Sequence, residues 1–164
     1  MASKLDKINE GIEKIEKYFI TWSMIIMSAV IFIQVIMRYV FNNSLSWSEE
    51  LTLFISTYMI WIAASYAIKK DAHLRITLFV DMFKGKPRIF VYLIIDIIWL
   101  AFSMGMIYLG EKMVRMSVLN NRVSPALEVP MWVIYASLIV GSLLMCLSLM
   151  IKIIEKVTAL TYRG

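Results

Sequence analysis

The sequence predicts an all-α integral membrane protein with four transmembrane helices and both termini in the cytoplasm. Hydrophobic residues make up 60% of the 164 residues, and most of them fall in four runs at about 18–40, 51–68, 89–109 and 132–151. Each run has roughly the twenty residues that a helix rising ~1.5 Å per residue needs to cross a hydrocarbon layer about 30 Å thick. The connecting segments are too short for a separate soluble domain, so we expect residues 1–164 to form a single membrane domain.

The expected orientation follows from the positions of Lys and Arg. All but four of the 17 basic residues lie before the first run, between the second and third runs, or after the fourth. The positive-inside rule places these segments in the cytoplasm and the other two loops outside. The net charge of +5 therefore reflects topology, and we expect no nucleic-acid partner. The charged first seventeen residues lack a small-residue cleavage pattern, so we expect no removable signal peptide.

Two amphipathic helices are predicted at the membrane interface. Residues 1–17 carry apolar side chains at steps of three and four, with charged residues between them, and should form a helix on the inner leaflet that runs into the first span. A second such helix is expected after His73 and before Gly85. The apolar positions are Leu5, Ile8, Ile12, Ile15 and Phe19 in the first helix, and Leu74, Leu78, Phe79, Met82 and Phe83 in the second.

Asp96 is an intramembrane carboxylate near the cytoplasmic end of the third run. A carboxylate at this depth costs at least about 2.5–3.5 kcal/mol unless it is paired or protonated. It is either a proton or sodium site, or a structural group that meets Lys69 or Lys70, or water, from the same side. We favour the structural interpretation, because the sequence places no second ionisable group at that depth in another run.

Several residues inside the runs are candidates for helix packing. Gln34 is expected to donate an interhelical hydrogen bond, and small residues four positions apart let two helices approach closely. Two tryptophans lie in the middle of runs, so they are not explained as interfacial anchors and indicate a packing surface that extends beyond this chain. The candidates are Gln34, Trp61, Trp99, Ala101, Gly105, Ser137 and Gly141.

The composition predicts no cofactor, metal site, substrate-binding site or catalytic site. Cys146 is the one cysteine of the chain and His73 the one histidine, so a disulfide framework, a thiol pair and a bis-histidine haem are excluded. The thirteen methionines are scattered and do not form the cluster that a copper path would need.

The two outward loops are the most distinctive segments. Ser46 is expected to cap the second helix, with Glu49 completing a capping box. The segment from Ser124 to Pro130 predicts a rigid turn before Trp132. Some polar groups remain that capping does not use, and these form a candidate docking surface for a partner: Glu50, Asn120, Asn121, Arg122 and Glu128.

Four segments of the chain follow one another in a specific order. They are Gln34–Asn42, Ser44–Leu51, His73, and Pro125–Leu127 followed by Pro130 and Trp132. Over nearly the whole chain, their order and spacing resemble the DctQ-like small membrane subunit of tripartite ATP-independent periplasmic (TRAP) transporters. The chain departs from this family pattern where it has Ala63, Ala64 and Ala72 instead of a Gly-Ala pair and a Gly before the histidine.

The resemblance implies an accessory role in secondary active uptake. In this family a periplasmic binding protein captures an organic acid, often a C4-dicarboxylate or a sialic acid, and a large membrane subunit moves it inward with sodium. The small subunit packs against the large one and does not hold the substrate. The expected partners are therefore the large TRAP subunit, the periplasmic binding protein and membrane lipids, in the bacterial inner membrane and without enzymatic activity.

Two functions from other classes remain as alternatives. A self-sufficient, small proton-coupled transporter would use Asp96 as its coupling carboxylate and would act as a homodimer. A membrane enzyme or quinone-reactive subunit would need a His, Cys or acidic cluster at one depth, and the sequence shows none. The runs also lack the discontinuous helix pair that builds a transport site, which favours the accessory role.

Overall fold

The computed structural model describes residues 2–70 and 86–162, and this part of the chain is helical apart from its outward loops. The helices are α1 (Ala2–Tyr39), α2 (Ser46–Lys69), α4 (Lys86–Leu119) and α5 (Trp132–Tyr162). Each contains a stretch long and apolar enough to cross a membrane. The prediction of an all-α membrane protein with four spans is confirmed. His73 and the second predicted interfacial helix lie outside the described residues.

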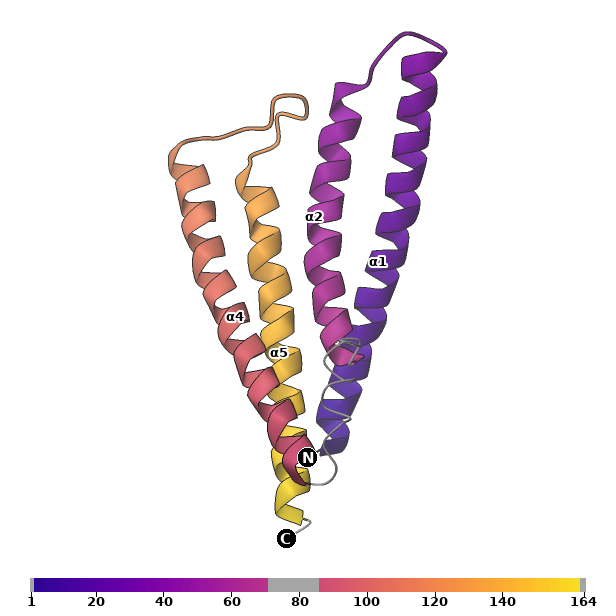
Figure 1. The fold of residues 1–164 in the computed structure, drawn as a ribbon. Coiled ribbons are helices and arrows are strands. Elements are labelled where there is room, and N and C mark those ends of the chain that lie inside the picture. The colour runs from indigo at the N-terminus through magenta and orange to yellow at the C-terminus, as the bar shows by residue number, and fades with distance from the viewer. Residues whose placement is uncertain (1, 71–85, 163–164) are drawn as a thin grey trace.

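The four helices stand side by side in an open row and do not close into a ring. α4 packs against α5, α5 against α2, and α2 against α1. α1 touches α5 only slightly, and the described residues of α1 and α4 make no contact. Figure 1 shows the helices close together at the end that carries both termini and further apart toward the outward loops, residues 40–45 and 120–131.

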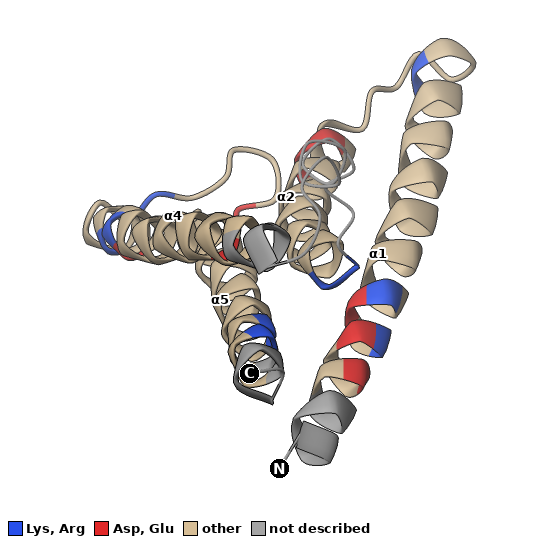
Figure 2. Ribbon diagram, turned by 60° about the horizontal axis from the view of Figure 1, so that its bottom comes forward, with Lys and Arg blue, Asp and Glu red and all other residues tan. Residues whose placement is uncertain are grey.

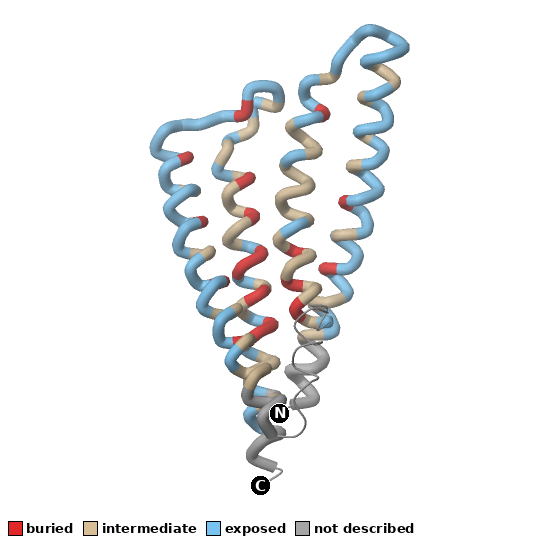
Figure 3. Tube along the Cα trace, in the orientation of Figure 1, coloured by how far each residue is buried: buried red, intermediate tan, exposed pale blue. Residues whose placement is uncertain are grey.

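α5 is the most buried helix of the row. Within the most apolar window of each span, 44% of the α5 residues are buried, against 17% in α2 and in α4 and 6% in α1. The apolar core lies where α2 and α5 meet near the cytoplasmic end expected from the sequence, as the buried segments in Figure 3 show. It contains Ile68, Met145 and Leu149, with Trp61, Ala64, Trp99 and Leu100 packed around them.

α1 is one continuous helix of 38 residues. No break separates residues 2–17, within the segment predicted as an amphipathic helix, from the first span. Its placement on the inner leaflet stays a prediction. The helix ends near Asn42, whose positive φ of 50° is a left-handed conformation that asparagine tolerates better than most residues.

α4 extends well beyond the apolar run at 89–109 and ends in a Schellman motif. Asn121 has a φ of 45°, its N–H donates to the Val118 carbonyl, and the Arg122 N–H donates to the Ser117 carbonyl, both at 3.1 Å. This hydrogen-bond pattern is typical of a helix terminated by one left-handed residue. The motif fixes the direction in which the chain leaves α4 toward the second outward loop.

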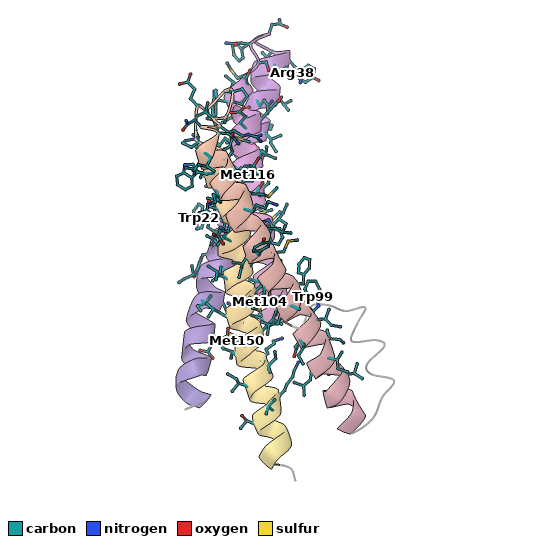
Figure 4. The ribbon with its side chains drawn as sticks, turned by 90° about the vertical axis from the view of Figure 1, so that its left-hand side faces the viewer. Trp22, Arg38, Trp99, Met104, Met116 and Met150 are labelled. Carbon is teal, nitrogen blue, oxygen red and sulfur yellow. The ribbon has the colours of Figure 1, made fainter. Side chains whose placement is uncertain are left out.

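Many large apolar side chains project from the row into its surroundings. Trp22, Met104, Met116 and Met150 are each more than half exposed, and Figure 4 shows them pointing away from the neighbouring helices. Such exposure would be costly in water but is expected where the surroundings are lipid tails or another membrane subunit.

Candidate functional site: polar contacts between the helices and at the outward loops

Asp96 is buried in α4 and forms an ion pair with Lys156 of α5. The Lys156 Nζ lies 2.5 Å from the Asp96 carboxylate oxygen and 5.1 Å from the centre of the Tyr92 ring. The expected partners Lys69 and Lys70 are wrong, because both lysines pair with carboxylates of α1 and α4 packs along α5. Lys156 reaches the carboxylate from beyond the predicted end of the fourth run, as a long lysine side chain allows.

Lys69 pairs instead with Glu16, a residue that the sequence analysis did not single out. The Lys69 Nζ lies 2.9 Å from the Glu16 carboxylate, and both side chains are only 2% exposed. Ser65 donates a second hydrogen bond to Glu16 at 2.8 Å. Burying a carboxylate this deeply is costly unless such partners compensate for the lost contact with water. The contact attaches the first third of α1 to the end of α2.

Two more lysines make contacts near the C-terminal end of α2. Lys70 lies 2.5 Å from Glu13, and this hydrogen bond raises the pKa of Lys70 above its ordinary value. Lys152 of α5 donates to the Ile68 carbonyl at 2.5 Å, which satisfies one of the last carbonyls of α2. Figure 2 shows acidic and basic residues together on α1 and basic residues on α5. These pairs could have been inferred from the sequence, because acidic residues before the first run and lysines after the second run are predicted to lie at the same side of the membrane.

At the outward end, Gln34 of α1 donates to the Glu49 carboxylate of α2 at 2.8 Å. Glu49 therefore does not complete a capping box with Ser46, and that expectation is wrong. α2 begins at Ser46 itself, with Leu45 in the N-cap position and no side-chain cap. The hydrogen bond from Gln34 to Glu49 satisfies a polar side chain of α1 that would otherwise face the apolar layer.

Glu50 fixes the second outward loop to α2. Its carboxylate accepts hydrogen bonds from the Ser124 hydroxyl, from the Ala126 N–H at 3.0 Å and from the Leu127 N–H at 2.9 Å. These donors follow Ser124 around the turn that contains Pro125. Glu50 was predicted to be available for a partner, and the structure shows it already engaged within the chain.

The other predicted docking residues lie on or next to the second outward loop. Asn120, Asn121, Arg122 and Glu128 are all exposed. Arg122 and Glu128 do not form an ion pair with each other in the described structure. Val123 and Pro130 form an isolated β-bridge that brings the two ends of the loop together, and Glu128 adopts a positive φ of 53° near its tip.

The small residues predicted for helix packing fall into two groups. Gly141 and Ser137 are buried, and a Cβ added at Gly141 would lie 2.4 Å from the Trp61 Cβ and 2.9 Å from its carbonyl carbon. The α2 and α5 backbones therefore approach closely at this point. Ala101 and Gly105 of α4 are exposed, and a Cβ at Gly105 would meet no atom within 4 Å.

The two mid-span tryptophans belong to the internal core. Trp61 and Trp99 are half-buried and pack against the cluster of Ile68, Met145 and Leu149. The Trp99 ring also meets Phe102 edge-on, with the ring centres 5.7 Å apart. The packing surface expected to extend beyond this chain is therefore better represented by Ala101 and Gly105 than by these tryptophans.

Taken together, these contacts hold helices in register, and none has the arrangement of a reaction centre. The described residues contain no group of three or more His, Cys, Asp and Glu side chains that could hold a metal ion. The polar contacts link neighbouring helices both near the termini and near the outward loops, so the charged residues that form them have a structural role.

The role of Glu50 can be tested by Glu50→Gln. An amide has one acceptor oxygen instead of two, so it cannot replace the carboxylate as acceptor for Ser124, Ala126 and Leu127. We expect faster amide hydrogen exchange at residues 124–127, measured by mass spectrometry. Glu49→Gln is the matched control and should leave this loop protected. Equal exchange in both variants would contradict the assignment.

The comparison with known families identifies the chain. The family model of the tripartite ATP-independent periplasmic transporters, DctQ component, matches residues 27–159. The chain is 29% identical over 101 residues to the C4-dicarboxylate TRAP transporter small permease protein DctQ of Vibrio cholerae, covering 62% of this chain and 44% of the relative. It is 30% identical over 109 residues to the sialic acid TRAP transporter small permease protein SiaQ of the same species, covering 66% and 63%.

A third relative is much longer than this chain. It is the isethionate TRAP transporter permease protein DctMQ of Oleidesulfovibrio alaskensis, 24% identical over 141 residues, which are 82% of this chain and 22% of the relative. The chain thus spans less than two thirds of each of these relatives. Since the family model covers most of the chain and four helices are suited to cross a membrane, the protein is a multi-pass inner-membrane protein that belongs to the DctQ-component family of tripartite ATP-independent periplasmic transporters.

Proposed function

We propose that this chain is the small accessory membrane subunit of a sodium-coupled TRAP transporter that imports an organic acid delivered by a periplasmic binding protein. The names of two relatives favour the C4-dicarboxylate and sialic-acid classes of substrate. The observation that carries the proposal, beside the family match, is the open row of helices. A row leaves both faces of its apolar helices without partners, as expected for a subunit that packs against a larger one.

The relative DctMQ supports a large membrane subunit as the partner. The stretch similar to this chain makes up only 22% of that permease, so a DctQ-like sequence occurs there within a much longer polypeptide. We assign the contact with the partner to the exposed face of α4 around Ala101 and Gly105. Small residues there allow a foreign helix to approach the α4 backbone closely.

The experiment that tests this proposal is purification of the tagged chain from its native membrane, with identification of the proteins that are recovered with it. Gly105→Leu should lower the yield of the complex while the chain itself remains folded, because a Cβ added at Gly105 meets no atom of this chain within 4 Å. Ala29→Leu, at an exposed position of α1, is the matched control for added bulk. Unchanged yield from Gly105→Leu would remove the α4 contact, and the absence of any large permease in the purified material would remove the accessory role.

We propose that both termini face the cytoplasm and that the two outward loops face the periplasm, where they help to receive the binding protein. The asymmetric distribution of Lys and Arg supports this orientation. With Glu50 engaged inside the chain, Glu128 and Asn120 become the exposed polar groups best placed for docking.

Charge reversal at Glu128 tests the docking role. Exposed charges at an interface act mainly on the rate of association and its salt dependence. Glu128→Lys should therefore lower uptake when the binding protein is scarce, with partial recovery when it is abundant, and should leave the membrane complex intact. Uptake assays at two concentrations of binding protein provide the measurement. Normal uptake at the lower concentration would leave the subunit as scaffold alone.

The alternative, a self-sufficient proton-coupled transporter, is tested at Asp96. We expect no uptake in cells that express only this chain, with or without Asp96→Asn, because the Asp96–Lys156 pair is a structural link between α4 and α5. In the complex, Asp96→Asn should be destabilising because it leaves Lys156 without its partner, and Asp96→Asn combined with Lys156→Gln should recover part of the loss. Uptake by the chain alone that Asp96→Asn abolishes would establish the alternative.

A further inference from the structure

A cavity of about 180 Å³ lies between the end of α4 and the beginning of α5. Its volume is several times the ~30 Å³ that a water molecule occupies in the liquid, so it has room for a small polar group. Its walls combine three polar and several apolar side chains. The polar ones are Ser117, Asn121 and Arg122, and the apolar ones include Val118, Val123 and Trp132.

Ser117 brings an unused hydroxyl group to this cavity. The side chain is 2% exposed, and its Oγ has no hydrogen-bond partner in the described structure. Two other buried helix serines avoid this situation by donating to a carbonyl three or four residues earlier, Ser137 to Ile134 and Ser148 to Leu144, whereas Ser142 shares it. A buried hydroxyl without a partner is unfavourable, so a ligand that accepts a hydrogen bond would be stabilised here.

Arg122 adds a cation whose backbone is fixed. Its N–H donates to the Ser117 carbonyl at 3.1 Å, and its own carbonyl accepts a hydrogen bond from the Met131 N–H at 2.9 Å. Arg122 forms no ion pair with a described carboxylate. A guanidinium group presents several N–H donors in one plane, which suits the oxygens of a phosphate.

The depth of the cavity determines which anion is available. The apolar run of α5 begins at Trp132, which lines the cavity, so on the α5 side the cavity lies where the apolar layer meets the headgroups. Trp132 is 42% exposed, as expected of a tryptophan at this interface. Beside the cavity, Val118 and Val123 are both more than half exposed and offer apolar contact to the glycerol backbone and upper acyl chain of a lipid.

We propose that this cavity binds the phosphate of a phospholipid from the leaflet next to the outward loops. Arg122 and Ser117 would donate hydrogen bonds to the phosphate oxygens, and Val118 and Val123 would contact the lipid below them. A carboxylate of a docked protein is a less favoured ligand. Glu50 holds residues 124–127 of the second outward loop on α2, and α2 lies on the other side of α5 from α4 (Figure 1). A protein that docks on this part of the loop would therefore lie away from the cavity. The proposal needs only the membrane location of the chain and does not depend on its part in transport.

Native mass spectrometry of the purified protein with phosphatidylglycerol tests the site. Arg122→Gln should weaken binding of one lipid molecule by about tenfold or more, and Ser117→Ala by a smaller factor. Arg38→Gln is the matched control: it removes the same charge at the outward end of α1, where Arg38 is exposed, and α1 and α4 stand at opposite ends of the row (Figure 1). Unchanged helix content by circular dichroism ensures that the variants are compared in the folded state.

Two competitors separate the chemical origins of the signal. Diacylglycerol, which lacks phosphate, should not displace the bound phosphatidylglycerol, and millimolar inorganic phosphate should displace little of it because the apolar contacts are missing. Equal binding by the Arg122→Gln and Arg38→Gln proteins would overturn the proposal, and so would full displacement by either competitor. If Arg122→Gln abolished capture of the purified binding protein but left lipid binding unchanged, the cavity would belong to a protein interface instead.

Discussion

Replacing Glu16 with alanine is expected to destabilise the protein by about 3–5 kcal/mol, the usual cost of removing one partner from a buried ion pair. The reason is the environment of Lys69, whose side chain is 2% exposed and would lose the carboxylate that lies 2.9 Å from its Nζ. Ser65 would lose its acceptor as well. Thermal unfolding of the purified protein in one detergent provides the measurement.

Two further variants separate the buried pair from general charge effects. Glu13→Ala removes the partner of Lys70 in an ion pair whose side chains are 29% and 49% exposed, and such exposed pairs contribute little. The combined Glu16→Leu and Lys69→Leu variant removes both buried charges and should recover most of the stability lost in Glu16→Ala. If Glu13→Ala and Glu16→Ala lowered the unfolding temperature equally, the burial of the Glu16–Lys69 pair would not explain the loss of stability in Glu16→Ala.

Replacing Gly141 with alanine is expected to cost about 1–3 kcal/mol, because a single added methyl group would force the α2 and α5 backbones apart. The nearest atoms to the added Cβ belong to Trp61 and include its backbone carbonyl group, at 2.9 Å for carbon and 3.0 Å for oxygen. Backbone atoms cannot move aside as the end of a flexible side chain can. The unfolding temperature of the purified protein should fall accordingly.

The chain supplies its own controls for this substitution. Gly105→Ala makes the same change in α4 where no atom lies within 4 Å, and it should be neutral or slightly stabilising because alanine favours helix more than glycine does. Gly110→Ala should be intermediate, since its Cβ would meet the Ile139 and Leu138 side chains at 2.8 and 3.3 Å. A loss of stability from Gly105→Ala as large as that from Gly141→Ala would contradict the assignment.

The positions of the spans could be predicted from the sequence because twenty apolar residues in a row leave few alternatives. The ends of the helices could be predicted only in part: Met113 and Met116 continue the apolar stripe of the third run to about residue 117, close to the end of α4 at Leu119. α4 continues to Leu119 and α5 to Tyr162, well past the apolar runs that end near 109 and 151. Hydropathy detects where a helix must avoid water, whereas a helix continues into polar surroundings for as long as its backbone hydrogen bonds remain favourable.

The partners of the charged residues could not be predicted because they depend on the order of the helices in space. The structural interpretation of Asp96 names Lys69, Lys70 or water as its partner, because the two lysines lie at the same end of their run as Asp96 does. Depth alone does not decide between neighbours, and the row places α5, with Lys156, next to α4. Glu50 could be placed from the sequence near the start of the second span, but its three hydrogen bonds to the second outward loop depend on a tertiary contact 74 to 77 residues along the chain.

The open row has a consequence for how the protein can come apart. In a closed bundle each helix is held by two neighbours, so the loss of one interface leaves a second route of contact. Here α1 is attached mainly through α2, and the described part of α4 mainly through α5. Failure of the interface between α2 and α5 therefore divides the molecule into two hairpins, each with its own ion pair, Glu16–Lys69 in one and Asp96–Lys156 in the other. The close approach of Gly141 to Trp61 lies in that interface, together with the hydrogen bonds that Tyr58 and Lys152 donate across it.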